Sequence, residues 1–196
     1  MIEVIDYDPA WADRFERLKT EYAEALSVAG VPVAAIEHVG STAVPGLAAK
    51  PIIDCDIVVD RSDVEAASAV LVGLGFAPLG ELGIPQRWAF DEPRRLAGTN
   101  TYVIVAGSLS LRNHLAVRDI LRAEPSLRDE YGRVKKRVGA TAEDIYEYGA
   151  GKNAMVQRIL EAAGLTEQDR ASIGSNNVPI RTRNRTRRKS DTWLSA

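Results

Sequence analysis

The spacing of apolar residues near the start of the chain predicts a long amphipathic helix. The aromatic and leucine side chains of this segment recur every three or four positions: Trp11, Phe15, Leu18, Tyr22 and Leu26. Residues at this spacing share one helical face, which packs on a core. We expect a helix capped by Asp8, with Pro9 at its first position, that ends near Val28.

Short apolar runs in the middle of the chain predict the strands of one sheet. The expected strands lie at 2–5, 36–39, 51–59, 76–79, 87–90 and 99–106, and a helix is expected over 63–74. The run 51–59 reads PIIDCDIVV, which is typical of a strand buried on both faces. Helical patterns return at 114–122, after Pro125 and over 141–163. The predicted fold class is therefore α/β (α+β), with a short mixed β-sheet, packed helices and a helical C-terminal half.

Two acids interrupt the most apolar of these strands. Asp54 and Asp56 are two positions apart, so their side chains leave the same face and their Cα atoms lie roughly 6.5 Å apart. Two carboxylates buried together need a cation, and magnesium binds through one or two carboxylates and the oxygens of a substrate phosphate. Cys55, between them, faces the other side and packs in the core. A turn at Gly40-Ser41-Thr42 offers backbone N–H groups and hydroxyls to the same phosphate.

A Gly-Ser turn, a loop of about a dozen residues and Asp-x-Asp on an apolar strand resemble the signature of the nucleotidyltransferase-like superfamily. The segment 38–59, HVGSTAVPGLAAKPIIDCDIVV, is similar to the typical segment of the GrpB (UPF0157-type) family within it. Further similarities are Tyr7-Asp8-Pro9-x-Trp11 at the start, HLAVRDILR at 114–122, and single residues of the helical half.

The resemblance implies a nucleotidyltransferase-like fold and a site for a nucleoside triphosphate. Asp54 and Asp56 would hold magnesium, with manganese as the alternative, while Gly40, Ser41 and Thr42 would bind phosphate. Five basic residues are candidates for offsetting phosphate charge: Lys50, Arg87, Arg118, Lys135 and Lys152. For each of the last four, a surface role or an ion pair is the structural alternative, and for Arg118 the obvious partner is Asp119.

The resemblance is incomplete on the strand 99–106. Where GrpB-like sequences read Asn-Leu-His-Val, this chain reads Asn100-Thr101-Tyr102-Val103. Catalytic nucleotidyltransferases usually carry a third carboxylate on the corresponding strand. Tyr102, with an ordinary pKa near 10, would be a weak base in its place.

Charge is divided unevenly along the 196 residues. Residues 181–196 hold six basic residues and one acidic residue, whereas residues 1–180 hold 19 and 26. An acidic body argues against nucleic-acid binding except through this tail. We therefore expect a domain over 1–165 and a polar to basic, disordered tail over 166–196. Neither a membrane-spanning run nor a signal peptide is visible, so a cytoplasmic location is expected.

Three functions follow from these features. The leading hypothesis is magnesium-dependent transfer of a nucleoside monophosphate from a nucleoside triphosphate to an unidentified small-molecule acceptor. The second is a catalytically silent nucleotide-binding or regulatory module with the same fold. The third is an RNA-associated protein that uses the basic tail.

Overall fold

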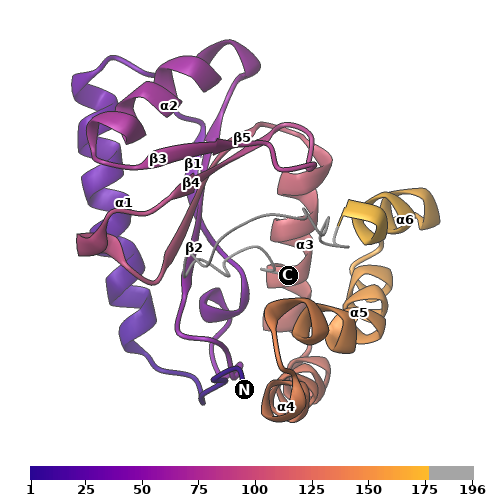
Figure 1. The fold of residues 1–196 in the computed structure, drawn as a ribbon. Helices are drawn as coiled ribbons and strands as arrows, with labels where there is room; N and C mark the ends of the chain where they lie inside the picture. Colours follow the sequence, from indigo (N-terminus) through magenta and orange to yellow (C-terminus); the bar gives the residue numbers. More distant parts are fainter. Residues whose placement is uncertain (177–196) are drawn as a thin grey trace.

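The computed structural model describes residues 1–176, and side chains as far as residue 174. A five-stranded sheet lies between two groups of helices, with α1 and α2 on one side and α3 to α6 on the other (Figure 1). The elements are α1 (Ala10–Val28), β1 (Ala35–Val39), β2 (Ile53–Val59), α2 (Val64–Gly73), β3 (Ala77–Gly80), β4 (Arg87–Asp91), β5 (Thr99–Val105), α3 (Leu109–Ala123), α4 (Pro125–Thr141), α5 (Ile145–Ala162) and α6 (Glu167–Asn176). The expected mixed sheet and helical C-terminal half are confirmed.

The strand order is β1-β2-β5-β4-β3, and β2 with β5 is the parallel pair. The other neighbouring strands pair in antiparallel fashion. Every residue of β2 and β5 is buried, because both strands lie inside the sheet with helices over both faces. The sequence patterns of these strands, nearly continuous in apolar and β-branched residues, are the physical reason for their central place.

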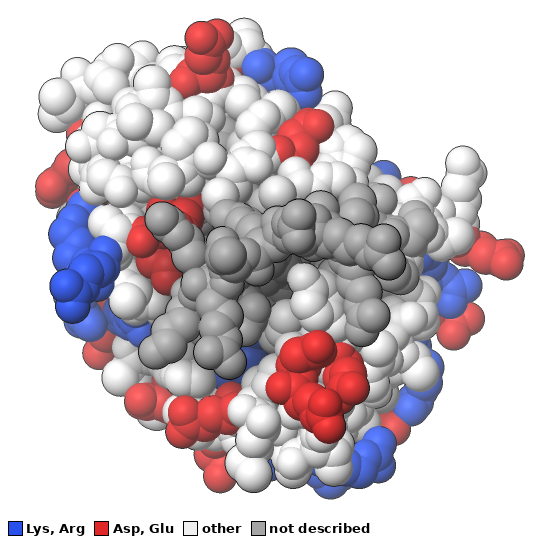
Figure 2. Space-filling model, viewed as in Figure 1, with Lys and Arg blue, Asp and Glu red and all other residues white. Residues whose placement is uncertain are grey.

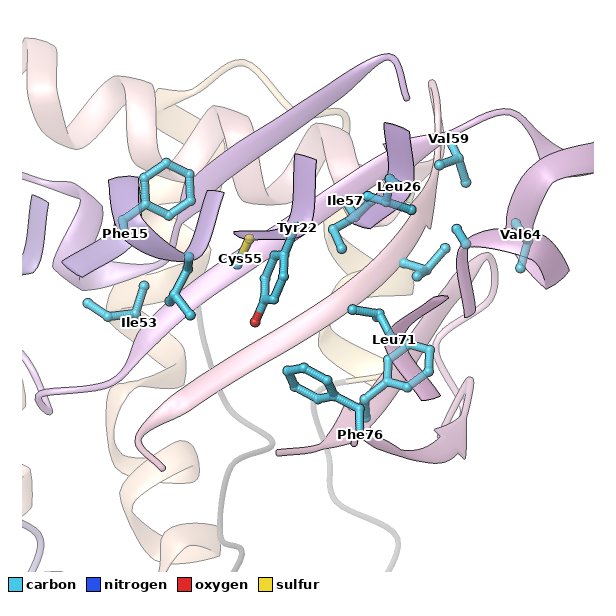
Figure 3. Close-up of a cluster of buried hydrophobic side chains, with 14 of the residues drawn as sticks. Phe15, Tyr22, Leu26, Ile53, Cys55, Ile57, Val59, Val64, Leu71 and Phe76 are labelled. Atoms are coloured by element: carbon cyan, nitrogen blue, oxygen red, sulfur yellow. The ribbon is translucent and has the colours of Figure 1, made fainter. Parts of the chain in front are cut away.

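The face of the sheet that meets α1 and α2 is apolar. Ile53, Cys55, Ile57 and Val59 of β2 point to this side and pack with the predicted core face of α1 (Figure 3). One polar contact crosses it, between the hydroxyls of Tyr22 and Thr101 at 2.9 Å. Cys55 is fully buried here, as expected, and burial raises the pKa of its thiol.

The opposite face of the sheet combines a small apolar cluster with buried polar side chains. Val58 and Ile104 pack against Leu111 of α3. The helices on this side have their own core, which includes residues of the loop before β2. The buried polar and charged residues of β2, β4, β5 and these helices include Asp54, Asp56, Arg87, Asn100, Asn113, His114, Lys135 and Lys152. On the face of the molecule drawn in Figure 2, the described acidic and basic side chains are interspersed rather than gathered by sign.

The structure corrects several boundaries at the two ends of the chain. The expected strand 2–5 is reduced to one bridge between Ile5 and Ala49, and the N–H of Ile2 donates to the carbonyl of Gly139 in α4 instead of to a strand. Helix α1 begins one residue later than expected, after Pro9, while the Asp8 carboxylate accepts from the N–H of Ala10 at 2.9 Å.

The first residues expected to be disordered form a helix instead. Helix α6 continues the ordered body beyond residue 165, and its Ile173 is buried in the core of the helical half. Ion pairs of Asp169 with Arg112 of α3 and of Arg170 with Glu161 of α5 join the helix to the body as well. Residues 177–196, which include the basic segment 181–196, lie outside the described residues.

Among the described residues, no helix is both long enough and apolar enough to cross a membrane.

Candidate active site

Asp54 and Asp56 lie side by side on the face of β2 that meets the helical half. Asp54 is 5% exposed and Asp56 is completely buried. The parallel register places them opposite Asn100 and Tyr102 of β5, so the four side chains share one face. The two acids therefore share one face, as expected from the sequence, and both carboxylates are buried.

Asp54 is held by a side chain of β5 and by the backbone of the Gly-Ser turn. Its Oδ1 accepts a 2.6 Å hydrogen bond from the amide of Asn100. Gly40, at φ +69°, lies so close that a Cβ built on it would be 2.1 Å from Asp54 Oδ2. Glycine is required here twice over, for the backbone conformation and for the space. The turn therefore packs directly on the first carboxylate.

Asp56 is held from the helical half. Its Oδ2 lies 2.7 Å from Nδ1 of His114 on α3, and His114 is itself 6% exposed. A carboxylate oxygen can only accept, so Nδ1 carries the proton. The other oxygen, Oδ1, is buried and has no hydrogen-bond partner among the described residues. A buried carboxylate oxygen in this state is costly unless a cation or a donor arrives.

This donor set fits a divalent cation that shares its coordination with a substrate. The unpartnered Asp56 Oδ1 and the neighbouring Asp54 carboxylate are hard oxygen ligands on one face of the sheet. Within the described part of the chain, no three His, Cys, Asp or Glu side chains converge as a metal site. The remaining ligands of a magnesium ion would therefore have to be phosphate oxygens and water.

Two buried lysines interact electrostatically with Asp54, and a third, Lys50, interacts with both of them. Lys135 of α4 and Lys152 of α5 are 2% and 5% exposed, and both feel the field of Asp54 and of Lys50. Burial, followed by a neighbouring lysine, lowers the pKa of Lys135 well below its usual value and that of Lys152 to about 7. Buried amines are stabilised in their charged form by an anion, and phosphate is the anion expected beside a metal-binding pair.

Tyrosine rings form the walls around these amines. The Nζ of Lys135 lies 4.5 Å from the centre of the Tyr131 ring. Lys152 and Lys50 lie 5.6 and 5.7 Å from the centre of the Tyr148 ring. Lys135 Nζ has no hydrogen-bond partner among the described residues, so its interactions there are with the ring and the field of its neighbours. The structure thus brings together all three lysines predicted from the sequence.

The Gly-Ser-Thr turn has divided roles. The Thr42 hydroxyl donates to the carbonyl of Ile52 at 3.0 Å and is 3.1 Å from Nε2 of His38. Its proton is therefore used within the fold, and the imidazole Nε2 must be the donor to the Thr42 oxygen. The Thr42 hydroxyl is thus engaged within the fold, whereas Ser41 is half-buried beside Gly40.

His38 predicts a pH-dependent loss of stability. Burial, with the fields of Arg122 and Arg118, lowers the pKa of His38 from 6.5 to about 4. The unfolded chain binds a proton below pH 6.5 and the folded chain only near pH 4, so stability should fall as pH falls through this window, by at most about 1.4 kcal/mol per pH unit.

We expect H38Q, which keeps a donor toward Thr42 but cannot titrate, to remove this dependence. Urea unfolding of both proteins at pH 4.5 and 6.5 measures it, since the carboxylates contribute equally to both. Parallel stability curves for the two proteins would show that His38 is not the titrating group.

Arg118 reaches the acid-bearing face through another carboxylate. It binds Glu37 at 2.6 Å and Asp119 at 2.7 Å, so the predicted ion pair is present. Glu37 lies opposite Asp56 in the antiparallel β1–β2 register, and therefore on the same face. Arg118 is accordingly committed to Glu37 rather than to the acid pair. Glu37 is a third acid on this face, on the β1 side and not on β5.

Arginines of the helical half also hold the turn. Arg122 donates to the carbonyl of Ala43 from Nε at 3.0 Å and from Nη2 at 2.7 Å. Arg128 donates to the carbonyl of Pro45 at 3.2 Å. These contacts join α3 and α4 to the loop that packs on Asp54, so the two halves of the molecule position the site together.

Sequence reasoning missed His114, Asn100 and Glu37 as site residues. No role was predicted for His114, although it lies within HLAVRDILR, one of the segments that carried the family resemblance. Asn100 and Tyr102 are placed opposite the two acids by the parallel pairing of β2 and β5. These residues are visible in the sequence, but the strand register that places them beside the acids cannot be predicted from it.

Comparisons with known proteins agree on one family. The family described as GrpB protein matches residues 1–162. The UPF0157 protein YqkA of Bacillus subtilis is 32% identical over 188 residues, which cover 93% of this chain and 53% of that protein. The chain thus spans about half the length of this relative.

The fold agrees with solved structures. The GrpB protein of Enterococcus faecalis matches with a TM-score of 0.72 and 30% identity over 83% of this chain and 98% of that one. The GLD-2/RNP-8 complex matches with a TM-score of 0.51 and 17% identity over 93% and 73%, a likeness of fold alone. The predicted nucleotidyltransferase-like fold is confirmed.

Proposed function

The chain belongs to the GrpB family, and we propose that it is a magnesium-dependent nucleotidyltransferase that transfers a nucleoside monophosphate from a nucleoside triphosphate to an acceptor. The observation that carries the proposal is that buried acidic and basic side chains lie close together on one face of the sheet. The carboxylates of Asp54 and Asp56 lie on one sheet face, and the amines of Lys135 and Lys152 lie in the field of Asp54 and of Lys50.

The reaction requires positioning and charge compensation more than covalent chemistry. A nucleophilic oxygen of the acceptor forms a bond to the α-phosphorus, the bond to the bridging oxygen breaks, pyrophosphate leaves, and the acceptor proton passes to solvent. Magnesium held by Asp54 and Asp56 would neutralise phosphate charge. The lysines offset the charge of the departing pyrophosphate, while Gly40 and Ser41 bring backbone N–H groups beside it.

Three features of this chain support pre-organisation of the acid pair. Asn100 and His114 each hold one carboxylate oxygen in place. The Gly40 backbone fixes the distance of the turn from Asp54. Both carboxylates therefore keep their orientation before a substrate enters, which reduces the cost of binding one.

A nucleotide-binding module without turnover is the second candidate. Among the described side chains, no third acid converges with Asp54 and Asp56 as a metal site, and Glu37, the other acid on this face, is paired with Arg118. Such a module would bind the same magnesium–nucleotide complex and release no pyrophosphate. The third hypothesis, RNA binding through residues 181–196, concerns a segment outside the described residues.

The phosphate role of Lys135 predicts a specific loss of nucleotide affinity. We expect K135M to weaken binding of magnesium-ATP at least 10-fold, because a buried amine is removed from the phosphate site and a side chain of similar shape replaces it. Isothermal calorimetry with ATP, GTP, CTP and UTP measures the change. K136M is the matched control, since Lys136 is exposed and pairs with Asp6. Equal losses in both variants, or in neither, would remove Lys135 from the phosphate site.

A further inference from the structure

Arg87 occupies a second cationic position on the acid-bearing face. It lies on β4 opposite Ile104 of β5, and its neighbour Ala89 lies opposite Tyr102. Its guanidinium carbon lies 4.6 Å from the centre of the Tyr102 ring. Since Tyr102 is itself opposite Asp56, the phenol ring stands between the arginine and the second acid.

This guanidinium is buried without a counter-charge. Arg87 is 4% exposed, and its Nε has no hydrogen-bond partner among the described residues. Within the part of the chain that the structure describes, no carboxylate comes within ion-pair distance of it, whereas Arg118 has two such partners. A charge removed from water with only an aromatic face for compensation destabilises the protein. An anionic ligand would remove that cost.

The two cationic positions lie on different sides of the acid pair. Lys50 precedes β2, and Lys135 and Lys152, which interact with it, lie in the field of Asp54, the acid nearer to the start of that strand. Arg87 lies on β4, two strands away from β2. Through Ile104 of β5 it is in register with Val58, the residue that follows Asp56 on this face of β2. A triphosphate on the lysines leaves Arg87 on the other flank of the acids.

We propose that Arg87 binds an anionic group, a phosphate or a carboxylate, on the acceptor. The inference rests on the proposed nucleotidyl transfer and names its second substrate class: a molecule with a nucleophilic hydroxyl and a negatively charged group. The planar guanidinium accepts such a group through parallel hydrogen bonds, and the Tyr102 ring supports its other face. This assignment also explains why the strand carries a phenol where a third acid would repel an anionic acceptor.

The test is a titration observed at Arg87 itself. The Nε–H signal of Arg87 in a ¹⁵N-labelled protein is identified by its disappearance in R87M. Inorganic phosphate, acetate and magnesium-ATP are then added in separate titrations. We expect a saturable shift of this signal with phosphate or acetate that persists when magnesium-ATP is already bound. The anion that saturates at the lower concentration identifies the charged group of the acceptor.

Stability supplies an independent measurement. R87M should raise the unfolding temperature, since it replaces an unpaired buried charge by an apolar side chain of similar length, and should abolish the phosphate or acetate effect. R61M is the control, because Arg61 is exposed and stacks on Trp88 of the other face at 5.2 Å; it should do neither.

The proposal is overturned if neither small anion moves the Arg87 signal, or if magnesium-ATP alone moves it and phosphate then cannot. It is also overturned if R87M lowers the unfolding temperature with no change in anion binding, since Arg87 would then be structural. Failure of the proposed nucleotide site appears differently, as the absence of any magnesium-ATP binding in the wild-type protein.

Discussion

Replacement of either acid by asparagine is expected to abolish nucleotidyl transfer while the fold persists. D56N keeps an oxygen that can accept from Nδ1 of His114, and D54N keeps one for the Asn100 amide. What each loses is the negative charge that would hold magnesium beside the phosphates, and a loss of about 1,000-fold or more in rate is expected. The unfolding temperature should fall more in D54N than in D60N, because loss of the Asp54 charge leaves the buried Lys135 and Lys152 without their neighbouring anion.

The matched control for this pair is D60N. Asp60 follows the same strand directly but is exposed. Pyrophosphate release with magnesium and each nucleoside triphosphate, together with calorimetry of the same proteins, makes the comparison. Equal magnesium-dependent nucleotide affinity in wild type, D54N and D56N would contradict the assignment of these carboxylates to the metal.

Gly40→Ala is expected to be the most damaging small substitution near the site. The new Cβ would lie 2.1 Å from Asp54 Oδ2 and 2.8 Å from its Cγ, in a backbone conformation with φ +69° and ψ −171° that is almost confined to glycine. Either the turn or the Asp54 side chain must move. We expect a loss of about 3 kcal/mol or more in the free energy of unfolding, together with loss of nucleotide binding.

Gly30 provides the control for backbone strain. It has the same φ of +69°, but nothing lies within 4 Å of a Cβ built there. G30A should cost only about 1–2 kcal/mol, the ordinary penalty of a left-handed residue, and should leave nucleotide binding unchanged. The difference between the two variants in urea unfolding isolates the contact with Asp54. Equal costs would show that the turn does not pack on this carboxylate.

The sequence predicted the acid pair because strand alternation is a local property. Residues two apart on a strand share a face, so Asp54 and Asp56 could be paired, and Cys55 assigned to the opposite core, before any tertiary information. The same reasoning placed the aromatic residues of α1 in the core. Each of these inferences depends on a few consecutive residues.

The partners of the acid pair could not be predicted in this way. His114 is 58 positions from Asp56, and Asn100 is 46 positions from Asp54. Their contacts depend on the parallel register of β2 with β5 and on the seating of α3, which periodicity does not encode. Glu37 likewise became visible as a neighbour of Asp56 only through the antiparallel register of β1 with β2.

The predictions for the two ends of the chain were wrong for a different reason. The apolar residues at 2–5 favour a strand, but a strand needs a neighbouring strand along its length. Among the described residues this segment makes a β-bridge only at Ile5, while Ile2 bonds to a helix carbonyl. Helix α6 has weak amphipathic character, and its attachment depends on the burial of Ile173 against α3 and α5. Short segments of this kind take their structure from tertiary contacts more than from intrinsic propensity.

The most direct test of the central claim is transfer of a labelled nucleotide by the wild-type protein. Each of the four α-³²P nucleoside triphosphates is incubated with magnesium and pools of hydroxyl-bearing acceptors, with anionic and neutral acceptors in separate pools and RNA in a third. We predict label in a product of the anionic pool, equimolar pyrophosphate, and neither in D54N or D56N. Binding of nucleotide without any labelled product in all three pools would contradict an enzymatic role and leave the nucleotide-binding module.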